Sequence, residues 1–182
     1  MTQPGAPSLI EKLNATWRRW SARPGGKWLF SRVLGTFVPY TGSIAPQVQE
    51  LRPGYAQVRM RDRRSVRNHL KSVHAIALAN LGEVSTGLAT LSAMPATVQG
   101  ILVRLSVEYL KKARGTLTAE CSSHPPVVTE PVEYEVTAEI RDEAGDVVAR
   151  VTATWRLRHD IRAQSGNARA SSRVPSESTG VT

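Results

Sequence analysis

Hydrophobic residues recur at helical spacing near the N-terminus. Ile10, Leu13, Trp17 and Trp20 are three or four residues apart, which predicts a short amphipathic helix. This apolar stripe could pack on the rest of the domain or lie on a membrane surface. A second short helix is expected over residues 28–37. The chain is therefore predicted to begin with two short helices.

Residues 72–94 form one long segment that is apolar nearly all round, and most of its side chains are small. A helix that is apolar on nearly every side has to be enclosed by other elements. Pro95 ends it. Glu83 lies at its centre, where a carboxylate would be costly inside a bilayer. We therefore interpret the segment as the buried helix of a soluble domain and expect no transmembrane segment.

Six further segments are predicted to be strands, namely residues 44–51, 55–61, 98–110, 116–122, 131–141 and 147–158. In residues 55–61 and 98–110, apolar and polar residues alternate, which is typical of half-buried strands. Two strands, one helix and four strands in that order predict an α+β fold, with one long helix against an antiparallel six-stranded sheet. We expect an N-terminal tail with short helices over residues 1–38, one domain over 39–160 and a disordered tail over 161–182.

The composition of the chain bears on its cellular location and on the chemical class of its partners. The chain has 182 residues, and its one cysteine, Cys121, excludes an intramolecular disulfide framework and a Cys-rich zinc site. A reducing, cytoplasmic location is the simplest expectation. The net charge of +9 indicates anionic partners. Standard nucleotide and metal motifs are missing, and no helix presents a basic base-reading face, so we expect no cofactor, no metal and no nucleic acid.

Glu83 and His74 are the strongest candidates for chemistry. Glu83 is the only charged residue over 72–103, and a buried carboxylate without a role is costly. His74 begins the same helix, where the unpaired N–H groups of Ala75 and the next residue can bind a developing oxyanion. The structural alternative is that Glu83 belongs to a wet polar stripe and that His74 is an ordinary first-turn residue.

The spacing of the two candidates has a consequence for assembly. Nine residues separate His74 from Glu83, so the side chains point to opposite sides of the helix, with a rise of about 13.5 Å. They cannot meet on one substrate within one chain. If both act in one reaction, the second comes from another copy, which a two-fold dimer supplies. We therefore predict a homodimer, which could pair further into a tetramer.

These residues resemble a pattern of the hotdog-fold acyl-CoA thioesterases, in particular the small thioesterases of the phenylacetate-pathway type. That pattern has an Asn, a His-Gly-Gly six residues later and an acidic residue nine after the His. Asn68, His74 and Glu83 match both spacings. Two flanking segments are also similar, residues 50–55 and 107–113. The resemblance implies a hotdog fold over 39–160, with its sheet wrapped around a central helix and its sites at a homodimer interface.

The resemblance also implies roles for individual residues. The N–H of Ala75, helped by that of Ile76, would polarise the thioester carbonyl. Glu83 of the second protomer would act as general base or nucleophile. Asn68 and His74 would orient water or substrate. Basic side chains would bind the phosphates of coenzyme A, namely Arg64, Arg67, Lys71, Lys111, Lys112 and Arg114.

The sequence also departs from the family pattern. Ala75-Ile76 replaces Gly-Gly, Glu83 replaces the commoner Asp, and Leu102 stands where some members have Ser or Thr. The leading hypothesis is an acyl-CoA thioesterase that hydrolyses a thioester at a dimer-interface site. Because Ile76 is bulky, a second hypothesis is a non-catalytic protein that binds acyl-CoA or a related lipid. Because the net charge is strongly positive, a third hypothesis is a basic interaction module that binds a membrane or nucleic acid.

Overall fold

The computed structural model describes residues 9–159. Three helices come first, followed by two strands, a short 3-10 helix, one long helix and four more strands. Their bounds are α1 Leu9–Ser21, α2 Gly26–Phe37, α3 Pro39–Gly42, β1 Gln47–Arg52, β2 Tyr55–Met60, η1 Arg64–Val66, α4 Ala75–Ala93, β3 Val98–Tyr109, β4 Leu117–Ser122, β5 Val132–Arg141 and β6 Val147–His159. The predicted disordered tail over 161–182 lies outside the described residues.

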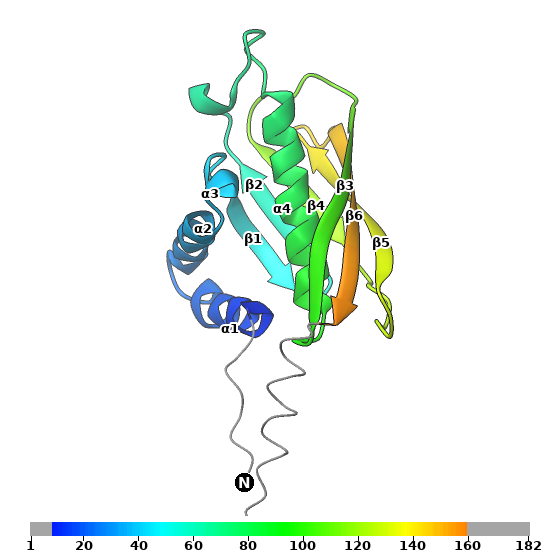
Figure 1. Cartoon of the computed structure of the whole chain (residues 1–182). Helices are drawn as coiled ribbons and strands as arrows, with labels where there is room; N and C mark the ends of the chain where they lie inside the picture. Colours follow the sequence, from blue (N-terminus) through cyan, green and yellow to red (C-terminus); the bar gives the residue numbers. More distant parts are fainter. Residues whose placement is uncertain (1–8, 160–182) are drawn as a thin grey trace, which may run out of the picture.

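The six strands form one antiparallel sheet in the order β1-β2-β4-β5-β6-β3. The sheet curves around α4, which runs along its concave face (Figure 1). The predicted α+β fold, with one long helix against a six-stranded antiparallel sheet, is confirmed. Because β1 and β3 stand at the two ends of this order, they form the two edges of the sheet.

Small residues let α4 lie close to the sheet. A Cβ added at Gly82 would stand 2.3 Å from the Cβ of Val151 on β6, so no side chain fits there. Large apolar side chains fill the remaining space between the layers, and those fully buried include Met60, Leu81, Leu117, Ile140 and Leu157. The close approach of the central helix to β6 therefore requires glycine at position 82.

The predicted full enclosure of this helix is wrong on one face. Ile76 is 53% exposed, and Ala79 and Glu83 are only partly buried. These three residues are three and four positions apart, so they lie along one side of α4. We call them the α4 stripe. The described part of the chain covers this stripe only in part.

The N-terminal helices pack on the domain. Trp17 of α1 is buried and contacts Phe30 of α2 edge to face, with ring centroids 5.0 Å apart. The apolar stripe of α1 therefore faces the core, and this answers the choice between packing and a membrane surface for that helix. The α2 helix lies along β1, where the Oγ of Ser31 accepts a hydrogen bond of 2.9 Å from the N–H of Val48.

The two edges of the sheet differ in how they are covered. The β1 edge is covered by α2, and the Nζ of Lys27 also donates to the carbonyl of Gln49. The β3 strand pairs with β6, and no strand within residues 9–159 pairs with its other edge. Large apolar side chains on β3 are exposed, namely Ile101, Val103 and Leu105. A long apolar strand with an open edge is a template for pairing with another chain.

Two element boundaries differ from the predictions by three residues, and the others differ by two residues or fewer. The central helix begins at Ala75 because His74 caps it in an extended conformation. The first strand begins at Gln47 because Ala45 has a φ of 46° and Pro46 follows it, which interrupts the predicted strand after Ile44. No helix among residues 9–159 is both long and apolar enough to cross a bilayer.

Candidate functional site

Asn68 shapes the loop that leads into α4. Its side-chain carbonyl oxygen accepts hydrogen bonds from the N–H of Leu70 at 2.9 Å and from the N–H and hydroxyl of Ser72 at 3.2 and 3.1 Å. The loop turns sharply here, and Lys71 adopts a left-handed φ of 56°. An Asx-type turn of this kind fixes the direction in which the chain enters the helix. The side-chain amide oxygen of Asn68 is thus committed to the loop.

His74 caps the N-terminus of α4. Its Nδ1 accepts a hydrogen bond of 3.1 Å from the N–H of Ile76, which leaves the ring proton of neutral His74 on Nε2. The N–H of Ile76 is therefore occupied in this structure. The N–H of Ala75 has no hydrogen-bond partner among residues 9–159. At the tip of a helix, this N–H is a donor that is free to bind an oxyanion.

A hollow of about 370 Å³ opens beside this helix tip. It is lined by Asn68, Ser72, Val73, Ala75, Leu78, Tyr109, Leu110, Lys111, Lys112 and Ala113. The hydroxyl of Tyr109 donates to the carbonyl of Ala75 at 3.2 Å and so ties the end of β3 to the tip. The fold therefore brings four predicted site residues together around this hollow, namely Asn68, Ala75, Lys111 and Lys112.

Glu83 lies elsewhere on the same helix. Eight residues separate it from Ala75, which corresponds to a rise of about 12 Å. Its carboxylate has no hydrogen bond or ion pair within the described part of the chain. Burial raises the pKa of Glu83, because leaving water penalises the charged form. A carboxylate whose pKa is raised accepts a proton more readily than an ordinary carboxylate does.

The aromatic ring of Trp155 lies close to the helix one turn after Glu83. A Cβ added at Gly87 would meet two ring atoms of Trp155 at 3.3 Å, and Gly87 is four residues after Glu83. The indole N–H of Trp155 is buried and unpartnered among the described residues. The ring of Trp155 thus packs against α4 one turn after Glu83.

The predicted phosphate-binding residues fall into two groups. Arg67 pairs with Asp62 at 2.6 Å, and Lys111 pairs with Asp142 at 2.9 Å and with Asp146. These partners raise the pKa of Arg67 and of Lys111 and compensate their charge. No ion pair within residues 9–159 involves the other four cations, Arg64, Lys71, Lys112 and Arg114.

A second hollow, of about 440 Å³, lies close to the first. It is lined by Arg61, Asp62, Arg67, Lys71, Arg114, Gly115, Thr116 and Glu143. Lys71 and Arg114 are its two predicted phosphate ligands without an ion pair in the described chain. Arg64 lines neither hollow. Three predicted site residues, His74, Ile76 and Glu83, also lie outside both hollows.

Tyr109 and Ser72 line the first hollow but were not predicted as site residues. Tyr109 is the last residue of β3, just before the basic turn at Lys111. A tyrosine hydroxyl at the end of a strand can donate a hydrogen bond to a neighbouring loop, and this signal could have identified it. Ser72 is recognisable only through its bonds to Asn68, which depend on the turn. No group of three or more His, Cys, Asp or Glu side chains in the described chain is arranged to hold a metal ion.

Comparisons with known proteins assign this architecture. Among solved structures, a structural genomics target is 34% identical, with a TM-score of 0.71 and coverage of 81% of this chain and 98% of that chain. A protein of unknown function from Pseudomonas aeruginosa, described as a probable thioesterase, is 25% identical, with a TM-score of 0.62 and coverage of 71% and 91%.

A mutant of the phenylacetic acid degradation protein PaaI from Thermus thermophilus is 19% identical, with a TM-score of 0.56 and coverage of 65% and 97%, and this likeness concerns the fold alone. A search of curated proteins found no match. The predicted hotdog fold is confirmed by these neighbours. Residues 26–157 match the model of a domain of unknown function, DUF4442, and the chain belongs to that family.

Proposed function

We propose that the chain is a thioesterase that hydrolyses an acyl-CoA at a site shared by two protomers. One observation carries the proposal. A half-buried carboxylate without a partner, Glu83, and an unused helix-tip donor, the N–H of Ala75, lie on one helix but about 12 Å apart. Two copies related by a two-fold axis can bring the acid of one to the tip of the other.

The open edge of β3 supports such a dimer. Its exposed apolar residues and the partly covered α4 stripe lie on two elements, β3 and α4, that contact each other. Pairing of two β3 edges would extend the sheet and bury these side chains. The probable thioesterase from Pseudomonas aeruginosa, which shares the fold at 25% identity, supports the assignment of the reaction class.

The proposed reaction needs only water as co-substrate. The carboxylate of Glu83 removes a proton from water as the water oxygen forms a bond to the thioester carbonyl carbon. The carbonyl oxygen becomes an oxyanion and accepts a hydrogen bond from the N–H of Ala75. Collapse of the intermediate breaks the carbon–sulfur bond, and the departing thiolate takes the proton from Glu83. The products are a carboxylic acid and free coenzyme A.

The surrounding residues have supporting roles in this proposal. Nε2 of His74 carries a proton and is available to donate to water or substrate. Asn68 fixes the loop through its carbonyl oxygen, and its amide group remains available to the ligand. Lys71, Lys112 and Arg114 are the proposed phosphate ligands, together with Arg64 on the neighbouring turn. Arg67 and Lys111 would first have to release their carboxylates.

Two variants of the helix tip test the oxyanion donor. Ala75→Pro removes the N–H from the first helical position, where proline is well tolerated, and His74 already has the extended backbone that precedes a proline. Ala75→Gly keeps the N–H and serves as the control. We expect Ala75→Pro to lower kcat by about 10²-fold to 10³-fold. Ala75→Gly should retain turnover.

Glu83→Gln tests the base and should lower kcat by about 10²-fold to 10⁴-fold. The assay measures release of free coenzyme A thiol across a panel of aliphatic and aromatic acyl-CoA substrates. If the wild type is active and both Ala75→Pro and Glu83→Gln retain its turnover, the proposed roles are wrong.

The non-catalytic alternative rests on Ile76. Its side chain is 53% exposed beside the helix tip, where the family pattern has glycine. A protein that binds acyl-CoA without hydrolysing it would show saturable binding by calorimetry and no thiol release with any substrate in the panel. Ile76→Gly then becomes the informative variant, because the loss of its bulk should create turnover if crowding alone prevents the reaction.

A further inference from the structure

Two hollows adjoin each other along α2. The larger, which we call the Arg32 hollow, has a volume of about 630 Å³ and is lined by residues that include Trp28, Arg32, Pro46 and Gln47. The smaller, which we call the Lys27 hollow, has a volume of about 390 Å³ and is lined by residues that include Arg23, Lys27, Trp28, Gln47, Gln49 and Arg61. Because Trp28 and Gln47 line both hollows, one ligand can reach both. Volumes of roughly 300–1,000 Å³ are typical of sites for small molecules.

The fold brings cations from three separate segments to the Lys27 hollow. Arg23 lies in the turn between α1 and α2, Lys27 lies in the first turn of α2, and Arg61 follows β2 directly. None of the three has an ion pair within residues 9–159, and no carboxylate of that part of the chain lines the hollow. The Nζ of Lys27 donates to the carbonyl of Gln49 at 2.7 Å, which fixes the ammonium group and leaves its other N–H bonds for a ligand.

The charge of this hollow favours an anion with more than one negative charge. Three cations in one hollow repel one another, and a bound anion relieves that repulsion. The surrounding sequence adds to the effect, because residues 12–49 contain six basic residues and no acidic one. A phosphate monoester carries a charge of about −1.5 to −2 at pH 7 and accepts hydrogen bonds from both arginine and lysine. A phosphate therefore suits the Lys27 hollow better than a single carboxylate does.

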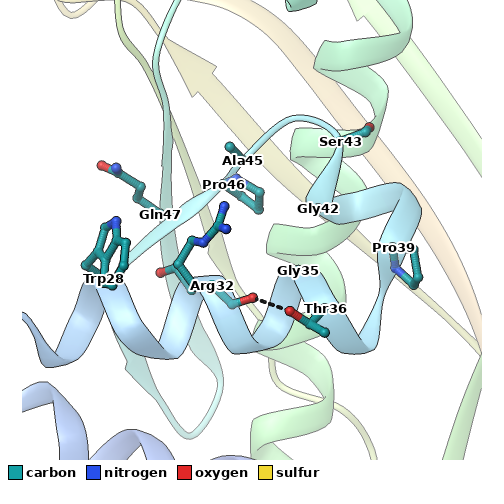
Figure 2. Close-up of a pocket in the computed structure, with 11 residues that line it drawn as sticks. Trp28, Arg32, Gly35, Thr36, Pro39, Gly42, Ser43, Ala45, Pro46 and Gln47 are labelled. Carbon is teal, nitrogen blue, oxygen red and sulfur yellow. Dashed lines mark hydrogen bonds between the residues drawn. The ribbon is translucent and has the colours of Figure 1, made fainter.

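Trp28 offers a flat aromatic surface next to these cations. Its side chain is 59% exposed, and Figure 2 shows Trp28 and Arg32 extending from α2 toward the chain at Pro46 and Gln47. The side-chain amide of Gln47 has no hydrogen-bond partner among the described residues, so it offers both a donor and an acceptor. Aromatic side chains stack on nucleobases, and an amide can pair with the polar edge of a base.

We propose that the two hollows form one binding site for a nucleotide. Arg23, Lys27 and Arg61 bind its phosphate in the Lys27 hollow, and its base stacks on Trp28 in the Arg32 hollow. No predicted site residue and no residue of the hollow at the tip of α4 lines either of these hollows. Nucleotide binding here therefore does not require that the chain hydrolyses a thioester. Two sources supply this chemistry, a free nucleotide and the nucleotide end of coenzyme A.

Calorimetry with the full chain tests this site directly. Adenosine 5′-diphosphate should bind saturably, and adenosine and inorganic phosphate should each bind at least about tenfold more weakly, because each engages one hollow only. Trp28→Ala should weaken binding of the diphosphate about tenfold or more and leave that of inorganic phosphate unchanged. Phe37→Ala is the matched control, because Phe37 is 78% exposed on the same helix and lines neither hollow. It should bind as the wild type does.

Two double variants separate local charge from overall charge. Arg23→Gln/Lys27→Gln and Lys12→Gln/Arg158→Gln each remove one lysine and one arginine, and all four side chains are exposed. Lys12 and Arg158 line neither hollow. Only the first variant should weaken binding of both the nucleotide and inorganic phosphate, by about tenfold or more. Arg61→Gln should act in the same direction, and it leaves the bond from Lys27 to Gln49 in place.

Coenzyme A distinguishes the two sources of the nucleotide. If the site takes the nucleotide end of coenzyme A, coenzyme A will displace adenosine 5′-diphosphate, and Trp28→Ala will raise KM for acyl-CoA without changing kcat. If the site takes a free nucleotide, coenzyme A will leave the diphosphate bound, and Trp28→Ala will leave KM unchanged. A chain that hydrolyses no thioester but still binds the diphosphate keeps this site and loses only the proposed function.

Four results would overturn the nucleotide site. The first is the absence of saturable binding of adenosine 5′-diphosphate to the wild type at millimolar concentrations. The second is binding of inorganic phosphate as tight as that of the diphosphate, which would exclude a base at Trp28. Equal loss of binding in the two charge variants would mean that overall charge alone attracts the anion. A short single strand of DNA that binds far more tightly than the diphosphate would assign this surface to nucleic acid.

Discussion

Replacing Gly82 by alanine would put a methyl group where α4 and β6 are already in contact. The added Cβ would lie 2.3 Å from both the Cβ and one Cγ of Val151 and 2.7 Å from its other Cγ. One of these atoms is fixed to the strand backbone, so rotation of the side chain cannot relieve the overlap. Carbon atoms at rest are about 3.5–4.0 Å apart, so the helix and strand would have to separate by roughly 1 Å.

The expected loss of stability follows from two opposing effects. Overpacking a close-packed core costs about 1–3 kcal/mol, and this contact belongs near the upper end. Alanine in a helix interior is about 1 kcal/mol more favourable than glycine. We therefore expect Gly82→Ala to lower the free energy of unfolding by about 2 kcal/mol. Glu83 is the next residue, so a shifted helix should also lower turnover, because small displacements of a catalytic group are costly.

Gly87→Ala on the same helix is the matched control. Its Cβ would approach only the ring of Trp155, at 3.3 Å, and a ring can yield by a few tenths of an ångström. We expect its stability to stay within about 1 kcal/mol of the wild type. Urea unfolding should be compared at one chain concentration, because a dimer is stabilised by its own concentration. If the two variants prove equally stable, the close approach of α4 to β6 is wrong.

Three further predictions concern burial and hydrogen bonding. Burial raises the pKa of the Cys121 thiol to about 12, so native protein should resist iodoacetamide at pH 8, and rapid labelling detected by mass spectrometry would contradict this. Burial also raises the pKa of Glu83, so its charge costs stability above the ordinary carboxyl pKa but not well below it. Glu83→Gln should therefore raise the free energy of unfolding at neutral pH and leave it unchanged in strong acid, and the opposite trend in pH-dependent urea unfolding would refute the burial. Ser31→Ala leaves the buried N–H of Val48 unpaired and should cost about 1–3 kcal/mol in the same unfolding assay. Thr36→Ala removes an exposed hydroxyl that bonds only within its helix and should be nearly neutral, so equal effects of the two would refute the role of Ser31.

The main elements could be predicted because their patterns are strong and local. The alternation along strands such as β2 and the run of small apolar residues in α4 predict which side chains are buried. The four-residue helix α3 could not be predicted, because one turn has no periodicity to detect. The partial exposure of the α4 stripe was also difficult to predict, since residues 72–94 are apolar on nearly every side and only Glu83 marks the side that lacks a neighbour.

The candidate site was only partly predictable, because some of its contacts depend on side-chain rotamers and on residues distant in the sequence. The spacing of Asn68, His74 and Glu83 located the helix tip and the acid. The hydrogen bond by which His74 occupies the N–H of Ile76 depends on a side-chain rotamer that no pattern encodes. Likewise, the carboxylates that compensate Lys111 lie 31 and 35 residues away in sequence. Such pairings arise only once the sheet has formed.

The α2 helix illustrates the limit of helical periodicity. Trp17 fits the spacing of an apolar stripe and is indeed buried. Trp28 and Phe37 lie in a helix that was also predicted, but the pattern did not show that these rings face outward while Phe30 faces the core. The α2 helix has apolar residues on more than one side, so burial of one side against β1 leaves the rest exposed.

A purified heterodimer tests the shared site most directly. Chains carrying Glu83→Gln and chains carrying Ala75→Pro can be co-expressed with different tags and isolated as a mixed dimer. If each site combines the acid of one protomer with the helix tip of the other, one of the two sites is fully wild type, and the heterodimer should show about half of the wild-type turnover. If both groups act within one chain, every site is defective, and the heterodimer will be as inactive as either variant alone.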